Sequence, residues 1–265
     1  MSAIETHAPG TFCWVELLAN DEQAAKEFYT RFFGWQANDT RYGEGESDIY
    51  TMLTLDGRNV GALYRMGQEQ RDQGTPTHWG LYVAVDDADQ AAARVRELGG
   101  TVILEPFEVM DAGRMAMLQD PTGAFLSVWQ ARAHIGMQVR DEDNAVVWSE
   151  LATPDPDTAE AFYTGLFGWG TKKEDVGIQY TSFLQGDTPV AGMYRITEEM
   201  QGMPPNWSPY FGTSDVDDAA RRATELGATL LVEPTDIPGV GRFAVIQDPQ
   251  GAMFSVVRLD AMQQS

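Results

Sequence analysis

The chain has 265 residues, of which 43% are apolar and 11% aromatic, enough to fill the core of one large domain or two ordinary ones. Its 18 basic and 40 acidic side chains give a net charge of −22. This charge disfavours nucleic acid and anionic membranes as partners, because both are negatively charged. The sequence contains no signal-peptide pattern and no apolar run long enough to span a bilayer, so the expected location is the cytoplasm.

The first predicted elements are a strand at 12–19 and a helix that ends in EFYTRFFGW at 27–35. The strand contains the only cysteine, Cys13, which cannot form an internal disulfide and is expected to be buried among its apolar neighbours. Asn20 or Asp21 can cap the helix, and Gly34 is expected to end it. Alternating or apolar runs then predict six further strands, at 50–55, 60–66, 79–85, 101–107, 114–119 and 124–130, and a second helix at 86–100.

The same series of elements returns in the second part of the chain. The segment AFYTGLFGW at 161–169 repeats the end of the first helix, and ELGAT, GRFAV and DPQGA repeat ELGGT, GRMAM and DPTGA. Pro156 is expected in the first turn of the repeated helix and Gly168 at its end. The chain is therefore interpreted as an internal duplication with domains at 1–134 and 135–265, joined by a polar connector.

Each half itself contains two β-α-β-β-β units, so the predicted fold class is α+β, with four such units paired into two domains. The repeated Phe-Tyr-x-x-x-Phe-Gly-Trp pattern is typical of an amphipathic helix that packs its aromatic side chains on a sheet. We therefore interpret it as a structural motif and not as a cofactor-binding one.

These motifs resemble the vicinal oxygen chelate superfamily, which includes glyoxalase I, extradiol dioxygenases, and fosfomycin and bleomycin resistance proteins. The resemblance covers nearly the whole chain and is greatest to the tandem glyoxalase-like proteins of actinobacteria, of the culture-filtrate antigen type. It implies that each pair of units curls into a cup around one site. Many members bind a divalent ion there through His or Gln, His, and Glu, which suits an octahedral ion with open positions for substrate.

The resemblance places the metal-ligand positions by their spacing from the helical Phe-Tyr pair and from the Asp-Pro-x-Gly turn. They fall on Trp14, Gly80 and Ser127 in the first half, and on Trp148, Ser208 and Ser255 in the second. These side chains are not suitable ligands for a divalent ion at such a site. We therefore expect no metal or other cofactor, although a divalent metal with atypical ligands stays open.

His78 is the one histidine placed inside a predicted unit, since His7 lies in the N-terminal tail and His134 in the connector. It could coordinate an ion together with Glu16 from the neighbouring strand. The preferred interpretation is a hydrogen-bonding or partly exposed residue at the start of a strand, with Asn206 as its counterpart in the second half.

Strand alternation also predicts which side chains point into the cups. The inventory is mostly aromatic with a few polar groups, which is typical of a pocket for a flat organic molecule. The alternative, that these side chains fill the cups completely, stays open. The predicted ligand-binding residues are Trp14, His78, Tyr82, Phe125, Ser127 and Trp129 in the first half, and Trp148, Asn206, Tyr210, Met253 and Ser255 in the second.

Glu16 and Glu150 are the candidate catalytic residues. A carboxylate directed into an aromatic cavity tends to have a raised pKa and can act as a general base. The same carboxylate can instead be a structural acceptor for a tyrosine hydroxyl or a tryptophan N–H. Arg114 and Arg242, each after a glycine, could hold an anionic ligand or be ordinary surface residues.

The leading hypothesis is a metal-free protein that binds or sequesters a small, partly aromatic organic ligand. The alternative is an enzyme: a cofactor-independent isomerase or lyase that uses Glu16 and Glu150, or a glyoxalase-like metalloenzyme with atypical ligands. A pure interaction module without a pocket is a third possibility. The expected state is a monomer or homodimer with a small-molecule partner.

Overall fold

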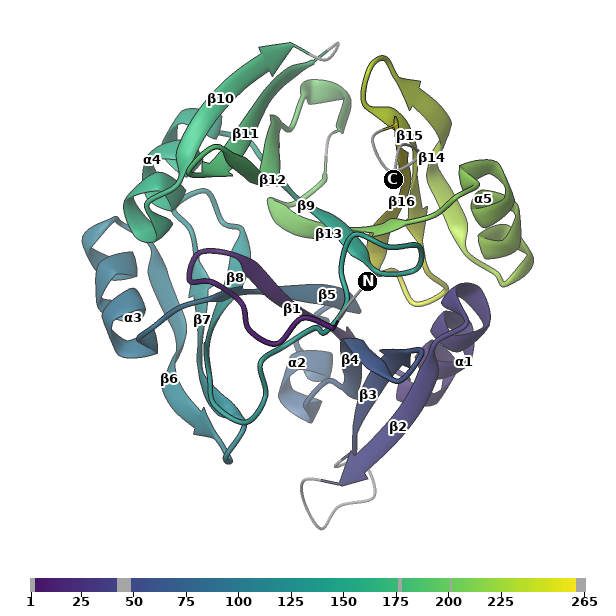
Figure 1. The fold of residues 1–265 in the computed structure, drawn as a ribbon, viewed down its shortest axis with the longest axis horizontal. Helices are drawn as coiled ribbons and strands as arrows, with labels where there is room; N and C mark the ends of the chain where they lie inside the picture. Colours follow the sequence, from purple (N-terminus) through teal and green to yellow (C-terminus); the bar gives the residue numbers. More distant parts are fainter. Residues whose placement is uncertain (1–2, 42–48, 176–177, 201, 261–265) are drawn as a thin grey trace.

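The computed structural model describes residues 3–41, 49–175, 178–200 and 202–260. Figure 1 shows the duplicated α+β fold, in which the β-α-β-β-β order occurs four times, as predicted. The elements of the first half are β1 (Phe12–Ala19), α1 (Glu22–Phe33), β2 (Gln36–Arg41), β3 (Ile49–Leu55), β4 (Arg58–Arg65), α2 (Gln68–Asp72), β5 (His78–Ala84), α3 (Ala88–Glu97), β6 (Thr101–Val109), β7 (Gly113–Gln119) and β8 (Phe125–Ala131).

The second half repeats this order, with a short 3₁₀ helix in place of α2. Its elements are β9 (Val146–Thr153), α4 (Pro156–Phe167), β10 (Gly170–Asp175), β11 (Gln179–Gln185), β12 (Thr188–Arg195), η1 (Glu198–Met200), β13 (Asn206–Gly212), α5 (Val216–Glu225), β14 (Thr229–Ile237), β15 (Gly241–Gln247) and β16 (Met253–Leu259). The predicted domain boundary at 134/135 lies between β8 and β9 and stays a prediction.

Each half forms its own eight-stranded sheet. The strand orders are β2-β3-β4-β1-β5-β8-β7-β6 and β10-β11-β12-β9-β13-β16-β15-β14. In the first sheet the central strands β1 and β5 are antiparallel, while β4 runs parallel to β1 and β8 runs parallel to β5. A site on the curved inner face of either sheet is therefore built from the strands of one half.

The repeated helices begin and end where their sequences predict. The side chain of Asp21 accepts hydrogen bonds from the backbone N–H groups of Gln23 and Ala24, and thus caps α1. Gly34 and Gly168 end α1 and α4 in the left-handed conformation, with φ of 72° and 70°. Pro156 is at the first turn of α4, where the missing N–H costs little.

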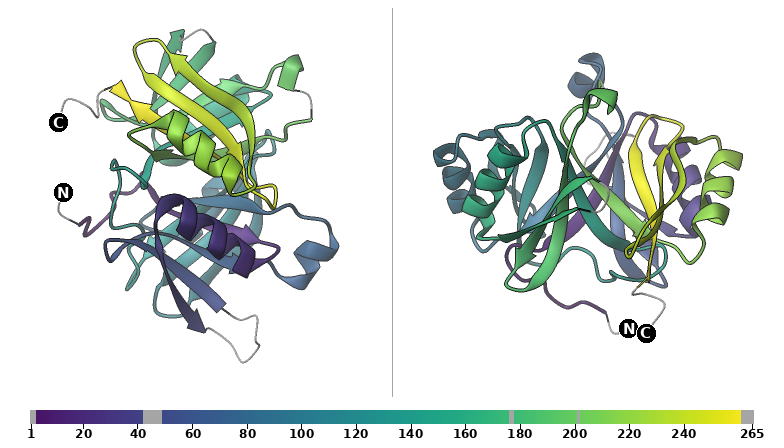
Figure 2. Two further views of the ribbon diagram at one scale, coloured as in Figure 1. Left: turned by 90° about the vertical axis from the view of Figure 1, so that its right-hand side faces the viewer. Right: turned by 90° about the horizontal axis from the view of Figure 1, so that it is seen from above.

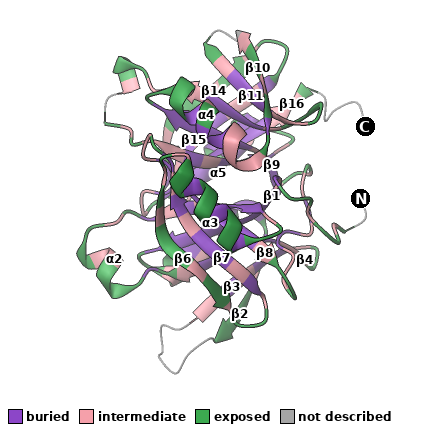
Figure 3. Cartoon of the chain, turned by 90° about the vertical axis from the view of Figure 1, so that its left-hand side faces the viewer, coloured by how far each residue is buried: buried purple, intermediate pink, exposed green. Residues whose placement is uncertain are grey.

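The two halves share one hydrophobic core. Figure 2 shows α1 with α5 on one flank of the molecule and α3 with α4 on the other, with both sheets between them. Buried residues gather on the strands and on the inner faces of the helices (Figure 3), and Cys13 is among them, as predicted. The motif residue Phe33 lies 4.8 Å from Phe211 of the other half, measured between ring centroids. The duplicated aromatic motif therefore packs the halves together.

The tryptophan that closes each motif also joins the halves. The indole N–H of Trp35 donates to the carbonyl oxygen of Asn144, and that of Trp169 donates to the carbonyl oxygen of Gly10, both at 2.8 Å. In the described part of the chain, no helix is both long enough and apolar enough to cross a bilayer.

Candidate functional site

The inner face of the first sheet carries a continuous row of side chains. Strand pairing sets Trp14 on β1 opposite Tyr82 on β5, and Tyr82 next to Ser127 on β8. Ser127 pairs with Met117, which pairs with Leu104 on the edge strand β6. Residues opposite each other in a sheet share a face, so these predicted residues of three strands do lie together. The corresponding row in the second sheet is Trp148, Tyr210, Ser255, Val245 and Val232.

A carboxyl group surrounded by tyrosines lies at the centre of the first face. Tyr82 and Tyr50 donate their hydroxyl protons to the two carboxylate oxygens of Glu16, the Tyr50 bond measuring 2.9 Å. The indole N–H of Trp14 donates to the Tyr50 hydroxyl at 3.1 Å. Glu16 is 6% exposed, so this network satisfies a nearly buried carboxylate.

The second half repeats the network with equivalent residues. The Tyr180 hydroxyl donates to Oε1 of Glu150 at 2.8 Å, and Tyr210 donates to the other oxygen. Trp148 donates its indole N–H to Tyr180 at 2.9 Å. Gly192 makes room for this arrangement, because a Cβ atom there would lie 1.7 Å from the Tyr180 hydroxyl oxygen.

Burial controls the protonation of both networks. It raises the pKa of Glu16 and of Glu150, and the tyrosine hydrogen bonds oppose the shift by stabilising the ionised forms. Burial and the adjacent carboxylate also raise the pKa of Tyr82 and Tyr210 well above the ordinary range. The tyrosines therefore stay protonated as donors, and each carboxyl group holds a proton more readily than an exposed one.

Sequence reasoning did not include Tyr50 and Tyr180, although they complete the two networks. Both begin a predicted strand at the same place in each half, in YTMLTL and YTSFLQ. A tyrosine conserved between the two halves was the available signal. It was missed because pairing of β3 with β4 is needed to bring that side chain over Glu16.

In the described structure, the hydrogen bond of the His78 ring is to the loop before its strand and not to Glu16. It pairs with Leu18 across the sheet, and its ring Nδ1 lies 2.8 Å from the carbonyl oxygen of Pro76. Asn206 likewise donates its amide to the carbonyl oxygen of Pro204 at 2.8 Å. Both residues thus occupy the start of a strand and bond to the preceding loop.

The outer wall of the first face is apolar and open to solvent. Phe125, Phe107 and Leu104 are 51%, 43% and 45% exposed. Phe107 pairs with Met115, which pairs with Trp129, and Phe125 pairs with Gln119, so the strand register places these side chains on the inner face. In the second half, the equivalent wall contains Val232, Phe243 and Met253. Large exposed apolar side chains on a concave face are typical of a surface that meets an apolar molecule.

A small cavity lies directly beside Glu150 in the second half. Its volume is about 30 Å³. It is lined by Glu150, Ala152, Tyr194, Met203, Asn206, Ser208, Tyr210, Val245, Met253 and Ser255. Four of the predicted second-half residues, Asn206, Tyr210, Met253 and Ser255, therefore surround one space with the candidate carboxylate.

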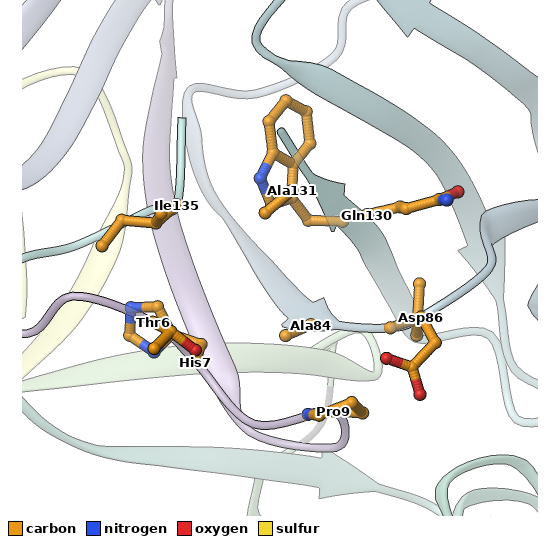
Figure 4. A pocket seen from close by; sticks show the side chains of 10 residues that line it. Thr6, His7, Pro9, Ala84, Asp86, Gln130, Ala131 and Ile135 are labelled. Atoms are coloured by element: carbon orange, nitrogen blue, oxygen red, sulfur yellow. The ribbon is translucent and has the colours of Figure 1, made fainter. Parts of the chain in front are cut away.

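A larger cavity, of about 230 Å³, lies between the N-terminal tail and the ends of β5 and β8. Figure 4 shows His7 and Ile135 on one side of it and Asp86 and Gln130 on the other. Trp129 also lines it, and donates its indole N–H to the carbonyl oxygen of His134 at 2.8 Å.

The ring of His134 packs edge-on against Trp14, with 4.5 Å between ring centroids. The connector therefore covers one end of the first inner face. Burial lowers the pKa of His134 to about 4, so the ring is neutral at physiological pH.

The two arginines considered as anion clamps have acidic partners. Arg114 forms ion pairs with Asp89 and Glu108, and Arg242 forms ion pairs with Asp217 and Asp236. Their charge is thus already compensated on the surface.

The fold and the inner faces define a two-domain cup protein of duplicated β-α-β-β-β units, with a buried carboxyl group at the centre of each cup. A model of the Glyoxalase/Bleomycin resistance protein/Dioxygenase superfamily matches residues 11–128 and again 133–256. The chain belongs to this superfamily, as its motifs predicted.

Two relatives align with almost the whole chain. "Putative glyoxylase CFP32" of Mycobacterium bovis is 41% identical over 251 residues, which cover 94% of this chain and 95% of the relative. "Anthracycline biosynthesis protein DnrV" of Streptomyces peucetius is 37% identical over 266 residues, which cover 95% and 94%. The tandem organisation is therefore shared over full length.

Solved structures share the fold at low sequence identity. The Mn(II)-bound glyoxalase from Novosphingobium aromaticivorans superposes with a TM-score of 0.64 at 16% identity, covering 97% of this chain and 83% of that one. The 2,3-dioxygenase LapB from Pseudomonas sp. KL28 gives a TM-score of 0.64 at 11% identity, with 95% and 93% covered.

The residues at the superfamily's metal-ligand positions do not fit a divalent ion. Gly80 has no side chain and lies opposite Glu16. The Trp14 indole nitrogen is a donor only, because its electron pair belongs to the aromatic ring system, and it donates to Tyr50. In the second half, the corresponding residues are Trp148, Ser208 and Ser255, which offer an indole N–H and two hydroxyls but no imidazole or carboxylate. Among the residues that the structure describes, no group of three or more His, Cys, Asp or Glu side chains could hold an ion.

Proposed function

We propose that this protein binds a small, partly aromatic organic molecule in its cups, with the carboxyl-tyrosine network as the polar anchor in place of a metal ion. The observation that carries the proposal is the joining of two features on one face. A solvent-exposed apolar wall, which includes Phe107 and Phe125, runs into a floor of hydrogen-bonded polar groups centred on Glu16. Apolar walls with a few convergent polar groups are the usual composition of sites for organic ligands.

The side chains at the metal-ligand positions favour the carboxyl-tyrosine network over a metal ion as the polar anchor of a ligand. Trp14, Gly80 and Ser127 occupy the ligand positions of the first cup, and their side chains offer no set of carboxylate or imidazole donors. A relative named for anthracycline biosynthesis is a reason to include an anthracycline among the compounds tested.

Titration of tryptophan fluorescence against a panel of aromatic metabolites and antibiotics tests the proposal. Trp14 and Trp148 each donate to a tyrosine of the network, so a ligand that reaches the carboxyl group changes their surroundings. Saturable quenching by at least one compound is the expected result. A flat response across a broad panel contradicts the proposal.

A second candidate function is metal-free acid-base catalysis by a lyase or isomerase of glyoxalase type. The observation that favours it is the raised pKa of Glu150, a carboxyl group that borders a cavity. A group of this kind can take a proton from an acidic carbon or hydroxyl of a bound substrate.

Replacing Glu16 and Glu150 by Gln distinguishes the two functions. For an enzyme, the double variant loses turnover and solvent-deuterium incorporation into the substrate while binding persists. For a binding protein, neither the parent nor the variant catalyses exchange. A glyoxalase-like metalloenzyme with atypical ligands is tested by elemental analysis of protein purified without chelator.

A further inference from the structure

The two cups differ at the residue that follows the carboxyl group on the same face of the central strand. In the first cup this residue is Leu18, which is buried and would lie 3.5 Å from a Cβ atom placed on Gly80. In the second cup it is Ala152, which borders the cavity beside Glu150. The shorter side chain therefore leaves space where the first cup is filled.

The cups also differ in the number of phenolic hydroxyls that reach the carboxyl group. Glu16 receives hydrogen bonds from Tyr82 and Tyr50, and the Tyr64 hydroxyl lies near enough to lower the pKa of the carboxyl group as well. Glu150 receives them from Tyr180 and Tyr210.

Tyr194, the counterpart of Tyr64, turns instead toward Met203, with its hydroxyl oxygen 4.0 Å from the sulfur. The two tyrosines hold equivalent places in the strands, since Tyr64 pairs with Tyr50 and Tyr194 pairs with Tyr180. The residue opposite the carboxyl group differs, because Ser208 takes the place of Gly80 and lines the cavity. The third hydroxyl is thus present at Glu16, and a cavity lies beside Glu150.

The cavity has room for a hydroxyl group. Its volume of about 30 Å³ exceeds what one water molecule needs. A carboxylate can accept about four hydrogen bonds, so Glu150 has capacity for a further donor. The rim contains Met203 and Met253, whose flexible thioether side chains adapt to and favour aromatic rings.

We infer that the second cup receives a phenol-bearing aromatic ligand, whose hydroxyl donates to Glu150 from the place that the Tyr64 hydroxyl takes beside Glu16 in the first cup. This inference rests on the proposed function and names its ligand class and its site. An anionic ligand group would be repelled by Glu150. An aromatic compound without a hydrogen-bond donor would bury an acceptor oxygen of Glu150 without a partner, and its affinity would be lower for that reason.

Isothermal titration of the full chain with 2-naphthol and with its methyl ether, 2-methoxynaphthalene, tests the inference. The two probes share the ring, but only 2-naphthol donates a hydrogen bond. We expect 2-naphthol to bind about tenfold more tightly, the effect of one lost hydrogen bond to a partly buried charged group. The preference should fall in Glu150→Gln, whose neutral amide oxygen is a weaker acceptor than a carboxylate, and stay unchanged in Glu16→Gln.

Ala152→Leu provides a second variant that is expected to fold, because the first cup has leucine at this place. It fills the cavity, and we expect at least a tenfold loss of 2-naphthol affinity. Ala93→Leu makes the same chemical change at an exposed position of α3 and should leave the affinity unchanged.

Each outcome has a separate meaning. Equal binding of both probes overturns the phenol inference and leaves the proposed function standing. A preference that falls in Glu16→Gln but not in Glu150→Gln overturns the assignment to the second cup. An unchanged affinity for 2-naphthol in Ala152→Leu also overturns the assignment to the second cup. Failure of both probes and of the whole aromatic panel overturns the proposed function itself.

Discussion

The hydroxyl group of Tyr29 in the first half donates a 2.9 Å hydrogen bond to Oδ2 of Asp248 in the second half. Tyr163 makes the reciprocal bond to Asp120, also at 2.9 Å. The repeated Phe-Tyr pair of one half is thus joined to the repeated Asp-Pro-x-Gly turn of the other, and each motif has a partner across the molecule. The two domains are therefore expected to unfold as one unit.

Removing one of these hydroxyls should destabilise the whole chain. In Tyr29→Phe, the buried Asp248 loses a donor and the indole N–H of Trp79 loses its 3.1 Å acceptor. We expect the free energy of unfolding to fall by about 1–3 kcal/mol, as measured by urea denaturation. Tyr163→Phe should have a similar effect. A change below about 0.5 kcal/mol, or two separate transitions in the parent protein, would contradict this coupling.

The buried carboxyl groups should make stability fall as the pH rises. Burial raises the pKa of Glu16 and Glu150 above the ordinary value of 4.5. Above pH 4.5 the folded chain therefore keeps protons that the unfolded chain has lost. Their contribution to stability is complete below pH 4.5 and is lost as the pH rises through the raised values.

The double variant Glu16→Gln/Glu150→Gln should accordingly lose less stability between about pH 5 and pH 8 than the parent protein. Urea denaturation at a series of pH values measures this difference. Glu199→Gln, at an exposed position on η1, is the control and should retain the parent slope. An unchanged slope in the double variant would show that the two groups ionise in the folded chain as they do in the unfolded one.

The first cup should gain a binding site when it is given the features of the second. Leu18→Ala removes the side chain that occupies the place of the cavity, and Tyr64→Phe removes the third hydroxyl at Glu16. We expect the double variant to bind two molecules of 2-naphthol per chain, where the parent binds one, in isothermal titration. The variant should also lose about 2–4 kcal/mol of stability. A stoichiometry that stays at one would contradict the proposed equivalence of Tyr64 and the ligand.

Chelation should leave the fold intact. Because Trp14, Gly80 and Ser127 do not form a donor set, no ion is expected to stabilise the native state. Dialysis against EDTA should shift the melting temperature by less than about 1 °C. A larger fall that Mn²⁺ restores would identify a metal site.

The sequence predicted the features that depend on local pattern. Period-two alternation put Trp14 and Glu16 on one face, and the caps at Asp21 and Gly34 marked the ends of α1. Pairs that are far apart in sequence could not be derived in this way. Tyr29 and Asp248 are each ordinary in their own segment, and only the packing of the two halves brings them together.

For the candidate site too, the sequence predicted which side chains share a face of a strand but not which of them pair. The pairing of His78 with Leu18, not with Glu16, depends on a strand register that alternation alone does not fix. Tyr64 and Tyr194 occupy equivalent places in the sequence, yet the Tyr64 hydroxyl lowers the pKa of Glu16, while the Tyr194 hydroxyl lies against the sulfur of Met203. Leu18 and Ala152, which pair with these tyrosines, differ in size, and only the structure shows that a cavity lies beside the smaller one.

The most direct test of the account is isothermal titration of EDTA-dialysed protein with 2-naphthol and the aromatic panel, before and after addition of Mn²⁺. Binding through the carboxyl-tyrosine network predicts saturable heat with one molecule per chain and the same affinity with or without the ion. Binding that occurs only after Mn²⁺ is added, or no heat from any compound, would contradict it.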